Sequence, residues 1–320
     1  MKNNFNAIKR LWVIGLISVT LSTFAQQDPQ YTQYMKNMGV INPAYATDDL
    51  GIVNFGVFHR SQWVGSVGGP KTFSAFAHLP FNDKVEVGLS FVNDNIGDGA
   101  IKENNIYADF AYKLQLNDKG KHLSFGLKAG VTLFSTNFNG YELESGGAGT
   151  DAAFGPGQSR TFPNVGVGVY YFTYNYYIGL SAPNLLQSKH LENQDGLDRL
   201  GSEEIHSFLT AGYVYDINEN FKLKPATMVR AVKNAPVMLD VSLNILCYNR
   251  VEAGVAYRLD DAVSGMVNFK IAKDLTIGYA YDHTISNFGN YNNGSHEVFI
   301  LFDLDLMGLN TGFNKSPRFF

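Results

Sequence analysis

The chain has 320 residues, of which 14% are aromatic and only 17% are charged, and its net charge at pH 7 is −4. The charged fraction lies well below the roughly 25% usual in soluble domains, and the acidic balance excludes a nucleic-acid-binding protein, which needs a basic face. The mean hydropathy of −0.11 argues against a helical membrane protein, whereas it suits a transmembrane barrel, in which only alternate residues face lipid.

The first 25 residues have the features of a secretory signal peptide. Lys2, Lys9 and Arg10 form a positive start, residues 11–24 are largely apolar, and Ala25 is a small residue at the expected cleavage point. A transmembrane helix needs about 20 predominantly apolar residues, and neither this run nor any later one reaches that length. A membrane-embedded mature chain would therefore have to be a closed barrel.

Residues 26–50 show no clear hydrophobic period and contain two prolines, Pro29 and Pro43, together with several aromatic residues. We interpret them as an ordered N-terminal segment that packs in or beneath the lumen of a barrel. A flexible periplasmic lead is the alternative.

Period-two alternation is the strongest pattern in residues 51–306, which we expect to form the barrel. Between 251 and 258, for example, Val, Ala, Val and Tyr alternate with Glu, Gly, Ala and Arg. Successive side chains of a strand point to opposite faces, so one face of each segment is apolar and the other polar. This alternation fits both a soluble sandwich and a membrane barrel.

The connections separate these two folds. The expected strands are 51–59, 72–79, 85–93, 106–116, 122–134, 164–171, 176–181, 206–215, 221–230, 238–245, 251–258, 263–271, 275–282 and 296–304. Every second connection has 3 to 5 residues, whereas the others reach 29 residues. Outer-membrane barrels have an even number of strands, short periplasmic turns and longer external loops. The sequence therefore predicts an all-β, antiparallel transmembrane barrel of about 14 strands.

Three details qualify this prediction. Pro225 falls within an expected strand and suggests a bulge or a strand end, because proline lacks a ladder donor. The run from Asn93 to Gly99 is expected to lie in a turn-rich external loop. The tail, residues 307–320, is expected to lie in the periplasm.

Catalytic and metal-binding patterns are not evident in the sequence. The seven histidines are scattered and have no metal-ligand spacing on one strand face, and no nucleophile elbow or phosphate-binding loop occurs. We expect neither enzymatic activity nor a cofactor. Charged residues on the polar faces carry both signs, which favours a lumen filled by ion pairs over a selective pore.

The two longest connections, 135–163 and 182–205, are the expected binding loops, because long loops on a rigid scaffold often carry function. Ordinary surface loops are the alternative. The candidate partner-binding residues in them are Phe154, Pro156, Asn184, Leu185 and Leu186. Trp63, with Arg60 and Gln62, forms a further candidate, since arginine beside an aromatic residue is typical of interface hot spots. A tryptophan in a membrane-interface girdle is the competing interpretation.

Several blocks resemble the PorP/SprF family of the type IX secretion system, in the same order along the chain. They include the mature start Gln27–Met35, the run Ile41–Ala46, Arg60–Gly65, Gly69–Thr72, Phe162–Tyr171, Tyr177–Ser181, Ile277–Asp282, Ser295–Glu297 and the ending Ser316–Phe320. Each block is unspecific alone, and the ordered set is specific. The chain departs from the family pattern at Asn37-Met38-Gly39 and at Thr47-Asp48.

The resemblance implies an outer-membrane component of type IX secretion. It implies binding of the C-terminal domain of a large secreted adhesin, in support of its export and surface retention. Other secretion components and outer-membrane lipid are further implied partners, and nucleic acid is not. The chain looks closest to the SprF branch, which serves gliding motility. The alternatives are a channel for hydrophobic compounds like the long-chain fatty-acid transporters, an outer-membrane enzyme and a soluble sandwich.

Overall fold

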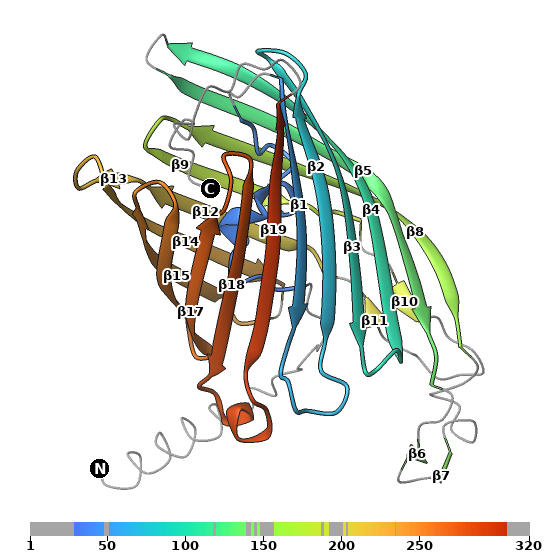
Figure 1. Ribbon diagram of the computed structural model, residues 1–320. Helices are drawn as coiled ribbons and strands as arrows, with labels where there is room; N and C mark the ends of the chain where they lie inside the picture. The colour runs from blue at the N-terminus through green and yellow to red at the C-terminus, as the bar shows by residue number, and fades with distance from the viewer. Residues whose placement is uncertain are drawn as a thin grey trace, which may run out of the picture.

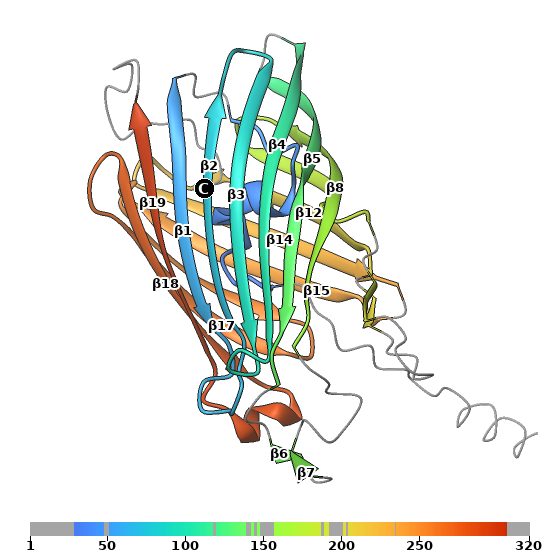
Figure 2. The same cartoon turned by 90° about the vertical axis from the view of Figure 1, so that its right-hand side faces the viewer.

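The computed structural model describes residues 29–47, 51–117, 120–138, 142–143, 146–147, 157–186, 189–191, 201–202, 204–233 and 235–305. Within these residues, fourteen antiparallel strands close into a barrel, as the sequence predicts (Figures 1 and 2). The predicted signal peptide 1–25 and tail 307–320 lie outside the described residues.

The strands of the first half are β1 (Ile52–Ser61), β2 (Lys71–Pro80), β3 (Val85–Ile96), β4 (Ile101–Asn117), β5 (Lys121–Thr136), β8 (Ser159–Phe172) and β9 (Tyr176–Ala182). Those of the second half are β12 (His206–Tyr213) with β13 (Tyr215–Asp216), β14 (Phe221–Val232), β15 (Met238–Cys247), β16 (Val251–Arg258), β17 (Ala262–Lys270), β18 (Leu275–Thr284) and β19 (Ser295–Asp305). The two longest connections contain the short pairs β6 (Glu142–Leu143) with β7 (Gly146–Gly147), and β10 (Lys189–Leu191) with β11 (Gly201–Ser202).

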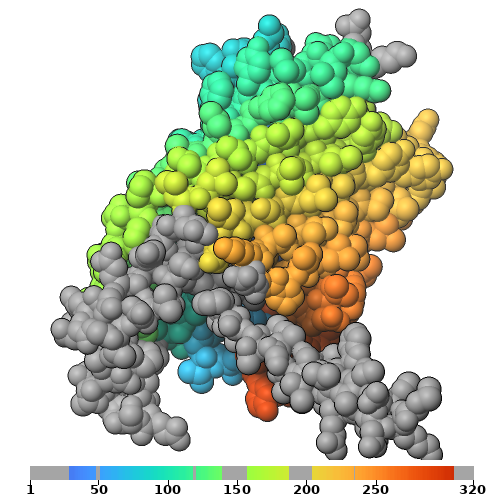
Figure 3. All heavy atoms as spheres, turned by 180° about the vertical axis from the view of Figure 1, so that it is seen from behind, coloured from blue at the N-terminus to red at the C-terminus, as the bar shows by residue number. Residues whose placement is uncertain are grey.

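Neighbouring strands pair in the order of the chain, and the first strand pairs with the last. In the register between β1 and β19, Arg60 lies opposite Glu297. On the other side of the barrel, β12 pairs with both β9 and β14. Figure 3 shows the strands of the rear wall as tilted bands, the arrangement that a closed barrel requires.

The predicted alternation is confirmed by the exposure of the side chains. In β16, the outward-facing Val255 is 59% exposed, whereas the inward-facing Glu252 is 4% exposed. The outer surface carries apolar residues along every wall, among them Leu89, Leu127 and Leu180. An apolar exterior and a polar interior are typical of barrels embedded in an outer membrane.

The connections differ at the two ends of the barrel. The turns at Phe81–Lys84, Thr173–Asn175 and Tyr248–Arg250 lie at one end, which we call the turn end. The connections between β1 and β2, β5 and β8, β9 and β12, and β18 and β19 lie at the other, the loop end. In outer-membrane barrels the short turns face the periplasm and the longer loops face the outside, which gives the orientation used below.

The prediction that residues 94–105 form an external connection is wrong for most of these residues. Strand β3 continues to Ile96 and β4 starts at Ile101, and Asn93 pairs with Asn104 in the ladder. A strand needs about 9–11 residues to cross the membrane, and β4 has 17. The polar residues that interrupt the alternation therefore belong to a hairpin that is longer than the membrane requires.

The prolines and loop boundaries also differ from expectation. Strand β14 runs unbroken through Pro225, which pairs with Leu243 of β15. On the other side of β14, the neighbouring strand is interrupted at Val214, between β12 and β13. The N–H group that proline lacks is therefore tolerated next to a break in the ladder. The expected loop 135–163 is shorter than predicted, because β5 extends to Thr136 and β8 begins at Ser159.

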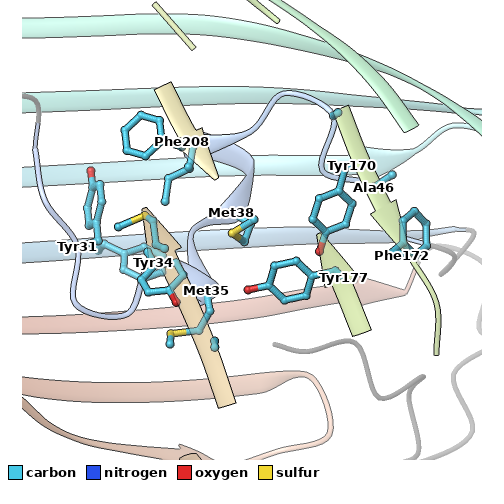
Figure 4. Packing of buried hydrophobic residues seen from close by; sticks show 14 of the residues in the cluster. Tyr31, Tyr34, Met35, Met38, Ala46, Tyr170, Phe172, Tyr177 and Phe208 are labelled. Carbon is cyan, nitrogen blue, oxygen red and sulfur yellow. The ribbon is translucent and has the colours of Figure 1, made fainter. Parts of the chain in front are cut away.

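Residues 29–47 lie inside the barrel, and we call them the lumen segment (Figures 1 and 2). The segment contains two short helices, η1 (Tyr34–Lys36) and α2 (Met38–Ile41). Its apolar side chains pack against inward-facing rings of the wall, and Figure 4 shows Met38 near Tyr177 and Phe208. None of the described helices is long and apolar enough to cross a membrane.

Candidate functional site

The lumen segment is held near the loop end by a cluster of buried charges. Arg60 of β1 contacts Asp282 of β18 at 2.5 Å and Glu297 of β19 at 3.1 Å. The same guanidinium donates to the hydroxyl of Thr32 in the lumen segment at 2.8 Å. Arg60 is only 1% exposed. The structure therefore places this candidate binding residue in the lumen, where it holds the segment, and not on the external surface.

Glu297 is the acceptor at the centre of this cluster. Its two carboxylate oxygens accept the backbone N–H groups of Thr32 at 2.8 Å and of Gln33 at 2.9 Å. The side chain is fully buried. Charge-assisted bonds of this kind are about twice as strong as neutral ones. The sequence resemblance included Glu297 but carried no signal that its partner would be the N-terminal backbone.

A second anchor holds the segment near the turn end. Glu86 of β3 accepts the backbone N–H of Thr47 at 2.6 Å and also contacts His78 at 2.6 Å. Lys113 of β4 lies 3.0 Å from the same carboxylate and donates to the carbonyl of Thr47 at 2.7 Å. The lumen segment thus runs along the barrel from the loop end to the turn end, with charged anchors at both.

The middle of the segment has polar and close-packed contacts as well. Lys36 lies 3.4 Å from Glu252, which also pairs with Lys224 at 2.6 Å. Asn42 donates to the carbonyl of Val169 at 3.2 Å. A Cβ atom on Gly126 would come within 2.1 Å of the backbone of Ala44. Glycine at this position of β5 therefore lets the segment approach the wall.

Two phenols of the lumen segment are buried with it. Burial raises the pKa of Tyr31 above its usual value. Burial also raises the pKa of Tyr34 well above its usual value, and the nearby Tyr177 and Asp240 raise this pKa further. Docking of the segment therefore favours the neutral form of both phenols.

A pocket lies between the lumen segment and the loop end, and we call it the outer pocket. Its cavity volume is about 70 Å³. The residues that line it are Pro29, Gln30, Tyr31, Val40, Ile41, Val92, Asn105, Tyr107, Pro183, Asn184, Phe208, Met228, Arg230, Met238, Asp240 and Arg258. The first five belong to the lumen segment, which forms the inner end of the pocket.

Apolar side chains from two connections gather at the loop end, and we call them the rim platform. Its members are Trp63, Val64, Val67, Ile285, Phe288 and Tyr291. Trp63 packs edge-to-face on Phe288 of η4 (Asn287–Tyr291), with ring centroids 4.9 Å apart. Val67 is 100% exposed and Tyr291 is 73% exposed.

Hydrogen bonds lock these two connections together. The backbone N–H of Val64 donates to the carbonyl of Gly294 at 2.8 Å, and that of Asn293 donates to the carbonyl of Val64 at 2.6 Å. Trp63 has a φ of 52°, a left-handed conformation that is uncommon for a bulky residue. Such conformations persist where the surrounding structure fixes them, and they gather at functional sites.

The remaining candidate residues fall into three places. Gln62 lies at the base of the β1–β2 connection, where its N–H donates to the carbonyl of Pro70. Asn184 lines the outer pocket and accepts from Asn164 at 2.6 Å, while Leu185 donates its N–H to the carbonyl of Val165. Leu186 is 42% exposed. Phe154 and Pro156 lie outside the described residues.

Solved outer-membrane proteins resemble this fold. The monoaromatic hydrocarbon channel CymD covers 83% of this chain and 91% of its own, with 13% identity and a TM-score of 0.49. Omp33 of Acinetobacter baumannii covers 80% and 99%, with 8% identity and a TM-score of 0.46. A FadL homologue of Pseudomonas aeruginosa covers 80% and 89%, with 12% identity and a TM-score of 0.44.

No curated protein matches the chain in sequence. The family model of the type IX secretion system membrane protein PorP/SprF matches residues 23–302, which include the lumen segment and nearly all of the barrel. The protein is thus an outer-membrane barrel, and it belongs to the PorP/SprF family of type IX secretion membrane proteins.

Proposed function

We propose that this barrel binds the C-terminal domain of a secreted surface adhesin at its loop end, and so supports the export and surface retention of that adhesin. The observation that carries the proposal is the lumen segment, which occupies the barrel interior with anchors at both ends. Because the interior is occupied, a large partner outside the cell would meet the barrel at its loop end. Gliding motility is the cellular process that we propose for it.

The rim platform supports this proposal. Large apolar and aromatic groups are enriched at the centres of protein interfaces, and a patch held rigidly before binding loses little entropy when the partner arrives. The platform has both properties, since Phe288 and Tyr291 are exposed and its two connections are hydrogen-bonded to each other.

The flanking segments belong to the same proposal. We propose that residues 1–25 direct export and are removed, that residues 26–50 form one N-terminal unit, and that residues 307–320 lie in the periplasm. The turn end and this tail would then contact other components of the secretion system. The outward-facing apolar side chains of the strands would contact membrane lipid.

The test is a gentle-detergent pull-down of the tagged barrel from its native membrane, followed by mass spectrometry. We expect a large adhesin, or its C-terminal domain, to co-purify. A Trp63→Ala and Tyr291→Ala double variant should lose most of this partner, whereas Tyr174→Ala, an exposed ring at the turn end, should retain it. Equal recovery from all three proteins would rule out the rim platform as the binding surface.

The long connection between β9 and β12 is tested separately. Replacing residues 187–203 with a short linker keeps Asn184 and Leu185 on the wall and removes most of the connection. We expect the barrel to assemble and adhesin attachment to be lost. Normal adhesin display in that strain would contradict a role for this connection.

A channel for hydrophobic compounds is the second candidate, and the outer pocket favours it because much of its lining is apolar. In that case the barrel should purify without a protein partner and with bound lipid or fatty acid. Movement of such compounds through the lumen would also require the lumen segment to leave its anchors.

A further inference from the structure

The outer pocket is a cavity, whereas the cluster of buried charges around Arg60 is closely packed and the rim platform is an exposed surface. Its walls come from the loop-end halves of β3, β4, β12, β14, β15 and β16, and its inner end is the lumen segment. Tyr31 and Ile41, which form part of that inner end, are both buried in the core of the lumen. The pocket therefore lies on the loop-end side of the lumen segment.

The size of the pocket limits that group. A cavity of ~150 Å³ lined by apolar side chains binds benzene, and the outer pocket has about half that volume, about 70 Å³. A group of three or four carbon atoms fits, such as the end of a leucine, isoleucine or valine side chain. An aromatic ring would have to displace the lining.

The lining is apolar where such a group would rest. Val40, Ile41 and Val92 provide branched side chains, and Phe208 provides a ring. Met228 and Met238 add flexible thioethers, which adapt to irregular shapes. Burying a leucine-sized side chain in such surroundings contributes favourably to binding because apolar area leaves water.

The carboxylate of Asp240, which lines the pocket, has one oxygen that accepts no hydrogen bond from the described residues. The Oδ1 atom of Asp240 accepts from Arg258 at 2.8 Å, whereas its Oδ2 atom has no hydrogen-bond partner among the described residues. Asp240 is 5% exposed. A buried acceptor of this kind is satisfied by a donor from the ligand, and the backbone N–H of an inserted segment supplies one.

We propose that the outer pocket receives a branched aliphatic side chain from the adhesin's C-terminal domain, with a backbone N–H of the same segment directed toward Asp240. The proposal rests on the adhesin-binding function proposed above. It adds a buried anchor, because binding energy concentrates in well-packed, fully desolvated pockets. A free small hydrophobic compound is the competing occupant, and the test separates the two.

The experiment measures binding of the co-purified adhesin's C-terminal domain to the detergent-solubilised, full-length barrel. Met238→Trp should fill the pocket and weaken binding at least tenfold. Leu243→Trp, on the outward face of the same strand, should bind as the unaltered barrel does. Heat-modifiable migration on a gel establishes that each variant is folded. Unaltered affinity of folded Met238→Trp would overturn the inference.

A photo-crosslinking residue of the size of methionine at position 238 tests occupancy of the pocket without filling it. Crosslinks to an aliphatic residue of the C-terminal domain support the proposal, and crosslinks confined to the barrel itself overturn it. Loss of bound fatty acid from Met238→Trp with full adhesin affinity would assign the pocket to a small hydrophobic compound. Failure of the unaltered barrel to bind the domain would instead refute the proposed function.

Discussion

The ammonium group of Lys113 donates a 2.7 Å hydrogen bond to the backbone carbonyl of Thr47, and so ties a barrel strand to the end of the lumen segment. Lys113→Met removes this bond and leaves Glu86 with one cationic neighbour fewer. We expect faster amide hydrogen exchange in residues 44–47, with the barrel still folded. Lys222→Met is the control, because its partner Asp216 is half exposed and such pairs contribute little. Equal exchange in both variants would contradict an anchoring role.

The anchor at the loop end should be the stronger one. Glu297→Ala removes the acceptor of two backbone N–H groups and leaves Arg60 with one carboxylate fewer, so it should weaken docking of the segment by roughly 3–5 kcal/mol. Trypsin should then cleave after Lys36, which the unaltered barrel protects. Glu297→Gln keeps an acceptor oxygen and should be cleaved more slowly than Glu297→Ala. A segment that resists trypsin in both variants would argue against this anchor.

Close packing at Gly126 makes a different prediction. Gly126→Val places new atoms where the backbone of Pro43 and Ala44 lies, so the segment should be displaced or the barrel should fail to assemble. Gly265→Val is the matched control, since a Cβ there has nothing within 4 Å. The yield of heat-modifiable barrel and the cleavage after Lys36 measure the two effects. The prediction fails if the two valine variants behave alike.

Alkaline pH should release the lumen segment. The pKa of Tyr34 is raised by burial, so the folded state favours the neutral phenol. The stabilisation is complete below the unfolded pKa of about 10 and declines as pH rises above it. The thermal midpoint of the barrel should therefore fall above pH 10, and it should fall less in Tyr34→Phe. Tyr174→Phe, at an exposed turn, should fall as the unaltered barrel does.

Much of the barrel wall could be predicted from alternation alone. The predicted strand 251–258 matches β16 because its outward residues are all apolar and its inward residues are polar or small. The hairpin of β3 and β4 was mispredicted for a physical reason. Its outer part is longer than the membrane requires, so Asn93 and Asn104 pair in a ladder that lacks an apolar face.

The site was less accessible from the sequence. Arg60 could be recognised as unusual beside Trp63, yet its side chain turns inward while the ring of Trp63 contributes to the rim platform. The alternation of β1 predicts which way the side chain of Arg60 points. It does not predict its partner Glu297, which lies more than two hundred residues away. Contacts between distant segments leave no local pattern that periodicity could detect.

The pairing of Arg60 with Glu297 also bears on how the barrel is built. These residues lie opposite each other on the first and last strands, where the sheet closes on itself, and Thr32 bridges them from inside. A barrel that closed on an empty interior would leave this seam with buried charges lacking one of their partners. Docking of the N-terminal segment and closure of the barrel are therefore energetically coupled, because the residues at the seam and the backbone of the segment satisfy each other's buried polar groups.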